Sequence, residues 1–84
     1  MATVKELSNS YQRYFLVLNW KATGLRTEIG PAAYDYIFRL ASRFAENPEL
    51  FDCIRIFVDS YNEAGERIES SLMHYLRDGK LISP

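Results

Sequence analysis

The sequence of 84 residues contains only one cysteine and one histidine. Cys53 cannot form a disulfide within the chain, and small secreted domains usually depend on disulfides, so we expect a reducing, cytoplasmic setting. Cys53 and His74 are also too few for a metal site built from the cysteine and histidine ligands of one chain. The sequence therefore predicts no metal ion and gives no sign of another cofactor.

Long apolar runs, glycine-rich loops and a strong net charge are missing as well. The longest apolar run, Tyr14 to Leu18, is far too short to cross a bilayer, and we expect no secretory signal because residues 1–7 lack its apolar region. The four glycines stand alone, which excludes a glycine-rich phosphate-binding loop. A net charge of −1 offers no general attraction for nucleic acid or anionic lipid. We therefore expect no membrane association, we infer no small-molecule substrate, and nucleic acid is a disfavoured partner.

The acidic residues form no catalytic pattern. They are scattered along the chain, and no two of them have a spacing that defines a general acid and a general base. A nucleophile–base pair of Cys53 and His74 is disfavoured. We expect His74 to lie opposite Ile54 on the neighbouring strand, and the side chains of Ile54 and Cys53, as successive residues of one strand, point to opposite faces. The sequence therefore predicts a protein that is not an enzyme.

The residues that are present predict one small folded domain. The chain is 48% apolar and 25% charged, close to the average of globular proteins. We expect residues 1–84 to form a single α+β domain, in which residues 1–10 are either a frayed arm or a single helical turn.

Residues 11–20 predict the first strand, because they are rich in aromatic and branched side chains. Alternation places Tyr14, Leu16, Leu18 and Trp20 on one face and Arg13, Phe15, Val17 and Asn19 on the other. Both faces are largely apolar. This pattern is typical of a central strand, or of a strand whose second face meets something other than water.

Gly30-Pro31 predicts the start of a helix, with proline at the first helical position, and Asn47-Pro48 predicts its end near Glu46. Residues 25–29 fit a loop or a short edge strand. The apolar side chains of the helix form one stripe, centred on Ala33, Ile37, Leu40, Ala41 and Phe44. We therefore expect one helix that covers one face of a small sheet.

Residues 51–76 predict a β-hairpin, because two segments with period-2 alternation flank a turn that contains Gly65. A loop of three residues, Glu63 to Gly65, keeps the inner face mostly apolar. It gives the pairs Ser60–Ile68, Val58–Ser70 and Ile56–Leu72. Its one flaw is that Asp59 lies opposite Glu69, a like-charge pair on the outer face.

The last third of the chain allows two interpretations. Residues 66–77 also fit a second helix, since several of their apolar side chains share one helical face. In the favoured interpretation they form a strand, and residues 80–82 return as a short final strand. The predicted fold is thus a small antiparallel sheet of three or four strands with one helix on one face, in the order β-α-β-β, with β-α-β-α less favoured.

One helix covers only one face of this sheet, which leaves the outer face for another role. Aromatic residues, methionine and arginine are enriched at protein interfaces, and the outer face combines them. We therefore predict a non-catalytic protein-interaction module that acts as a homodimer, as a small accessory or inhibitory subunit of a larger complex, or as both. The predicted partner-binding residues are Arg13, Phe15, Val17, Arg55, Phe57, Tyr61, Met73 and Tyr75.

Three alternatives remain open at this point. Residues 1–10 or residues 81–82 could fold over the outer face and bury it internally. The same face could stack single-stranded nucleic acid on its aromatic residues, although the acidic side chains there disfavour it. Finally, the chain could be an enzyme whose site, with Cys53 or His74, is completed across a dimer.

Overall fold

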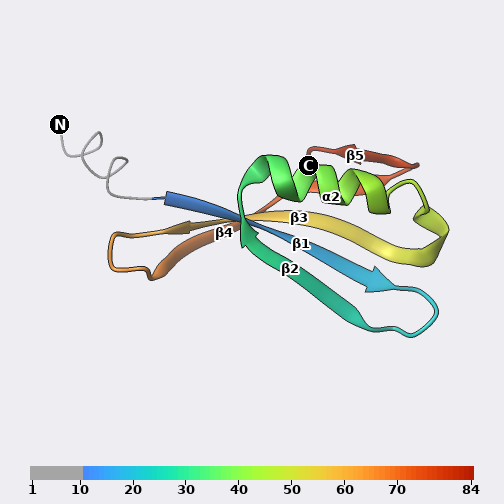
Figure 1. Ribbon diagram of the computed structural model, residues 1–84, viewed down its shortest axis with the longest axis horizontal. Coiled ribbons are helices and arrows are strands. Elements are labelled where there is room, and N and C mark those ends of the chain that lie inside the picture. Colours follow the sequence, from blue (N-terminus) through green and yellow to red (C-terminus); the bar gives the residue numbers. More distant parts are fainter. Residues whose placement is uncertain (1–10) are drawn as a thin grey trace.

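The computed structural model describes residues 11–84, which form one antiparallel sheet and one α-helix (Figure 1). The strands are β1 (Tyr11–Trp20), β2 (Arg26–Ala32), β3 (Phe51–Tyr61), β4 (Arg67–Arg77) and β5 (Lys80–Ile82), and the helices are α2 (Tyr34–Phe44) and the short 3₁₀ helix η1 (Pro48–Leu50). The strands lie in the order β2-β1-β3-β4-β5, each antiparallel to its neighbours. The α+β class is confirmed, but the sheet has five strands rather than three or four. Residues 1–10, the predicted arm, lie outside the described residues.

Strand β2 continues through Gly30-Pro31, so the prediction that these residues open the helix is wrong. The register between β1 and β2 shifts at this point, after Tyr14 of β1. Gly30 has a φ of +136°, and a Cβ at this position would lie 2.6 Å from the carbonyl oxygen of Tyr14. The glycine is therefore required for a close approach of two strands and does not mark a helix start, and helix α2 begins later, at Tyr34.

Helix α2 packs on one face of the sheet, as predicted, where it contacts β1, β2 and β3. Ile37 and Ala41, from the predicted apolar stripe, are its buried residues. Ala33 of that stripe is exposed, because it precedes the helix as an extended N-cap. The helix ends at Phe44, slightly before the predicted end. The buried core consists of Leu16, Leu18, Ile37, Ala41, Phe51, Ile54 and Ile56.

Strands β3 and β4 form the predicted hairpin, so the alternative of a second helix over residues 66–77 is wrong. The predicted register holds only next to the turn, where Tyr61 pairs with Arg67. Two irregularities then shift β4 along β3, as β-bulges do. Away from the turn, the predicted pairs are replaced by Ser60–Glu69, Asp59–Ser70, Val58–Ser71, Phe57–Leu72, Ile56–His74 and Arg55–Tyr75.

The shifted register removes the flaw of the predicted one. Asp59 lies opposite Ser70, whose hydroxyl donates a hydrogen bond to it, and no longer opposite Glu69. Each shift also inserts one residue into β4, and one inserted residue exchanges the two faces of the strand beyond it. A prediction from hydrophobic alternation assumes that every residue of one strand pairs with one residue of the next, so it could not locate these insertions.

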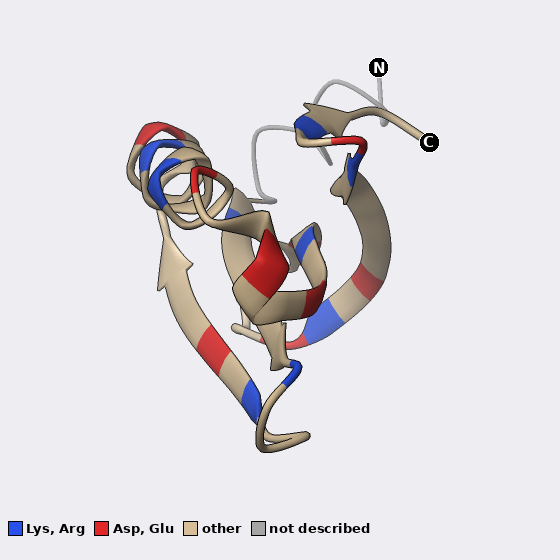
Figure 2. Cartoon of the chain, turned by 90° about the vertical axis from the view of Figure 1, so that its right-hand side faces the viewer, with Lys and Arg blue, Asp and Glu red and all other residues tan. Residues whose placement is uncertain are grey.

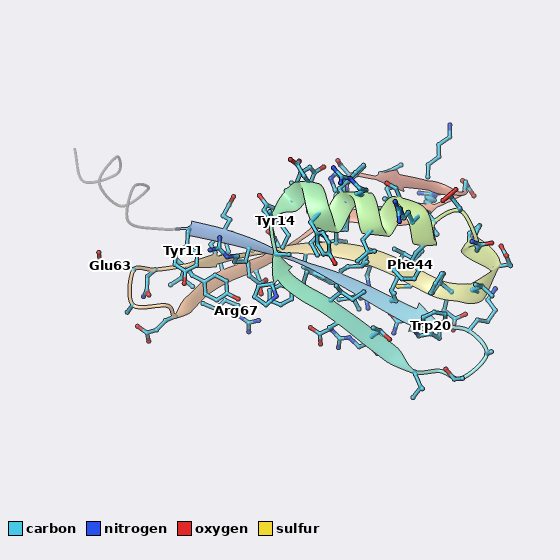
Figure 3. The ribbon with its side chains drawn as sticks, in the orientation of Figure 1. Tyr11, Tyr14, Trp20, Phe44, Glu63 and Arg67 are labelled. Carbon is cyan, nitrogen blue, oxygen red and sulfur yellow. The ribbon has the colours of Figure 1, made fainter. Side chains whose placement is uncertain are left out.

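The two ends of the sheet differ in how they are covered. The turn of the β3-β4 hairpin projects beyond helix α2, together with the start of β1 (Figure 1). Tyr11, Glu63 and Arg67 lie at this projecting end (Figure 3). Trp20 and Phe44 lie at the opposite end, with their rings 6.4 Å apart in an edge-to-face contact. The helix therefore fixes one half of the sheet, and the projecting half depends on contacts between the strands themselves.

Candidate protein-binding face

The candidate functional surface is the side of the sheet that faces away from helix α2, which we call the outer face. Figure 2 shows the helix end-on, on one side of the curved sheet. Among residues 11–84 the single α-helix packs on the inner side, against the core, so it leaves the outer face uncovered. The side chains of this face are Arg26 and Glu28 from β2, Tyr11, Arg13, Phe15, Val17 and Asn19 from β1, Cys53, Arg55, Phe57, Asp59 and Tyr61 from β3, and Arg67, Ser70, Leu72 and Tyr75 from β4.

The structure brings all but one of the predicted partner-binding residues together on the outer face. Arg13 is exposed, whereas Phe15, Arg55, Phe57, Tyr61 and Tyr75 are partly buried. Val17 is only 1% exposed, although it faces away from the helix, because larger side chains of β2, β1 and β3 surround it. The apolar area open to a partner is therefore smaller than the sequence predicts, and Val17 forms part of its floor.

Met73 is the one predicted partner-binding residue that does not lie on the outer face. It packs against the core on the helix side, and Leu72 takes its place on the outer face, opposite Phe57. The cause is the register shift between Phe57 and Ile56, which inserts one residue into β4 at this point. The prediction that Met73 faces outward is thus wrong.

Cation–π contacts order the aromatic side chains of the outer face. Tyr11 stacks on Tyr61 with 5.4 Å between the ring centroids, and the guanidinium of Arg13 lies 4.9 Å from the centre of the Tyr11 ring. The guanidinium of Arg55 lies 5.5 Å from the centre of the Phe57 ring. Such contacts contribute about 0.5–1 kcal/mol each at exposed sites. The rings are therefore held by their neighbours before any partner binds.

Asp59 is a buried acidic residue beneath the outer face, at 5% exposure. Its carboxylate accepts a hydrogen bond of 2.5 Å from the Ser70 hydroxyl and lies 3.7 Å from the guanidinium of Arg67. A buried carboxylate requires such partners, because an unpaired buried charge costs several kcal/mol. Asp59, Ser70 and Arg67 line a hollow of about 140 Å³, with Phe15 and Phe57 among its apolar walls.

Strand β2 contributes two charged side chains to the outer face that were not predicted from the sequence. Arg26 and Glu28 lie there as an exposed ion pair, 3.6 Å apart. The signal that would have found them is the alternation of these charged residues with Thr27 and Ile29, which is typical of a half-buried strand.

Arg55 occupies the centre of the outer face, between Val17 of β1 and Tyr75 of β4. Its Nη2 donates a hydrogen bond of 3.0 Å to Oδ1 of Asn19. Its Nε is buried and has no acceptor among the described residues, and neither of the two ion pairs found there includes Arg55. Beside it lies an open hollow of about 350 Å³, lined by Asp52, Cys53, Ile54, Arg55, Leu72, Tyr75 and Leu76.

Cys53 and His74 lie on opposite sides of the sheet. His74 faces the helix, where its Nε2 is 3.2 Å from the hydroxyl of Tyr34, and it pairs with Ile56 rather than with the predicted Ile54. Cys53 lines the hollow beside Arg55. Over residues 11–84, no group of three or more histidine, cysteine or acidic residues is placed to hold a metal ion. In the same part of the chain, every helix is too short or too polar to span a bilayer.

No protein-family model matches the chain, and neither a curated protein nor a solved structure matches it significantly.

Proposed function

We propose that this chain is a non-catalytic protein-interaction module that binds a protein partner through its outer face, as a small accessory or inhibitory subunit of a larger complex. The observation that carries the proposal is that the only α-helix of residues 11–84 leaves this face uncovered. Phe15, Phe57 and Tyr75 are only partly buried there. Covering them with a partner would remove apolar surface from water, which favours association by about 25 cal/mol per Å² before the entropic and desolvation costs of binding are subtracted.

The side chains of the outer face are held in place before binding, and this also favours protein binding. Arginine and tyrosine are the residues that most often dominate the binding energy of a protein interface. Here Arg13 and Tyr11, and likewise Arg55 and Phe57, are already held in contact with each other. Side chains that are ordered in advance lose less conformational entropy on binding, and this loss costs about 0.5–1.5 kcal/mol per immobilised flexible side chain.

Single-stranded nucleic acid fits the outer face less well. Bases bind such surfaces by stacking on open aromatic rings. The ring of Tyr11 already contacts Tyr61 and Arg13, and Arg55 lies over Phe57. Bases would have to displace these contacts before they could stack on the rings.

The proposal is tested by affinity capture from the native host with three forms of the chain. The parent is compared with the double variant Phe15→Ser, Phe57→Ser and with the control Tyr36→Ser, which removes an aromatic residue that is 56% exposed on helix α2. We expect the parent and the control to retain the same partner, and the double variant to lose it. Far-UV circular dichroism and the fluorescence of Trp20 report whether the double variant is folded.

Two results would contradict the proposal. A folded double variant that retains the partner would place the binding site elsewhere on the molecule. A parent chain that sediments as a monomer and captures no protein would leave the outer face without a role in association.

A further inference from the structure

The outer face carries a surplus of positive charge, although the chain as a whole has a net charge of −1. Its positive side chains are Arg13, Arg26, Arg55 and Arg67, and its negative side chains are Glu28 and Asp59, with Asp52 at the hollow beside Arg55. Arg26 pairs with Glu28, and Arg67 pairs with Asp59. Arg13 and Arg55 therefore have no acidic partner among residues 11–84.

Arg55 needs a partner for its charge more than Arg13 does, because Arg55 is partly buried at the centre of the face. Asn19 accepts one hydrogen bond from its guanidinium, and Asp52 lines the neighbouring hollow without forming an ion pair with it. The walls of this hollow are mostly apolar, with Leu72 and Tyr75 among them. Burying this cation under a partner costs free energy, and an anionic group of the partner offsets that cost most strongly.

We infer that the occupant of the outer face is a protein segment of acidic and apolar character, in which a carboxylate pairs with Arg55 and an adjacent apolar side chain enters the hollow lined by Leu72 and Tyr75. This inference rests on the proposed function and specifies the partner. Planar guanidinium groups bind carboxylates through paired hydrogen bonds, which gives the contact both strength and direction.

The same charge balance disfavours a second copy of the chain as the occupant. Two outer faces docked on each other would bring two surpluses of arginine together, and like charges brought into contact oppose association. Of the two predicted occupants of the outer face, a second copy of the chain is therefore less favoured than a different protein.

A phage-displayed library of random peptides, selected on the full chain, tests the inference. We expect the enriched peptides to contain aspartate or glutamate next to an aliphatic or aromatic residue. Arg55→Gln should weaken their binding about tenfold or more, the cost expected for truncating one partner of a buried charge pair. Arg39→Gln, which changes an exposed arginine on helix α2, should leave affinity unchanged within about twofold.

A change on the peptide side tests the same contact without altering the fold. Replacing the acidic residue of an enriched peptide by its amide should weaken binding to the parent chain about as much as Arg55→Gln does, with little further loss when both changes are combined. Fluorescence anisotropy of labelled peptides gives these affinities, and urea unfolding confirms that Arg55→Gln is folded.

The outcomes separate this inference from the proposed function. In one outcome, the peptides lose binding to the double variant Phe15→Ser, Phe57→Ser and yet lack acidic residues, or bind Arg55→Gln as tightly as the parent. Such peptides overturn the inference and leave the proposed function standing. Peptides that bind the folded double variant unchanged overturn both. An oligothymidylate that displaces the peptides, or a dimer of the parent chain that Arg55→Gln dissociates, also overturns the inference.

Discussion

Ile56 and Ile68 are two isoleucines on neighbouring strands for which the structure predicts very different losses of stability on substitution. Ile56 of β3 is 0% exposed and belongs to the core beneath helix α2. Ile68 of β4 is 60% exposed and lies where the register of the hairpin shifts. In the register that the sequence predicts, by contrast, Ile68 faces inward opposite Ser60. The pair of changes Ile56→Ala and Ile68→Ala therefore distinguishes the two registers.

The expected magnitudes follow from burial. Ile56→Ala leaves a cavity in a packed core, and such changes lower the free energy of unfolding by about 2–5 kcal/mol. The total free energy of unfolding of an 84-residue domain is about 4–13 kcal/mol, so this loss is a large part of it. Ile68→Ala removes a side chain that is already in water, and we expect a change within about 0.5 kcal/mol.

Urea unfolding followed by the fluorescence of Trp20 measures both variants. Trp20 is the only tryptophan, and its ring contacts Phe51 at a centroid distance of 4.6 Å, so unfolding changes its surroundings. We expect equal slopes for the parent and both variants, with the midpoint lowered only in Ile56→Ala. If Ile68→Ala lowered the midpoint as much as Ile56→Ala does, Ile68 would face the core and the shifted register would be refuted.

Two further substitutions test other parts of the fold. Gly30→Ala should lower the free energy of unfolding by about 1–3 kcal/mol, because a Cβ at φ +136° would meet the Tyr14 carbonyl. Thermal unfolding measures this loss, and an unchanged midpoint would argue against the close approach of β2 to β1. Tyr34→Phe should cost about 0.5–1.5 kcal/mol, because it removes the hydroxyl that lies 3.2 Å from Nε2 of His74; urea unfolding measures the loss, and a stabilised variant would show that this bond is not formed.

Much of the architecture could be predicted from side-chain periodicity. The bounds of the first strand, the buried side of the helix and the existence of the hairpin all follow from patterns that span many residues. The start of the helix could not be predicted in this way. Gly30-Pro31 is equally suited to a helix start and to a strand in close contact with its neighbour, and only the packing against Tyr14 decides between them.

The candidate site was predicted in outline but not in detail. Its β1 and β3 residues follow from simple alternation, whereas Met73 and Leu72 exchanged places because one inserted residue in β4 reverses the faces. The ion pair of Arg26 and Glu28 was missed because a short edge strand leaves only a weak pattern. Which side chains face outward thus depends on how the strands pair, and the local sequence does not show this pairing.

Cross-saturation NMR on the isotope-labelled full chain, in complex with its captured partner, shows whether that partner binds the outer face. We expect saturation to reach the amides around Phe15 of β1, Arg55 and Phe57 of β3 and Tyr75 of β4, which lie on one side of the sheet. Saturation confined to the exposed side of helix α2, around Tyr36, would refute binding through the outer face.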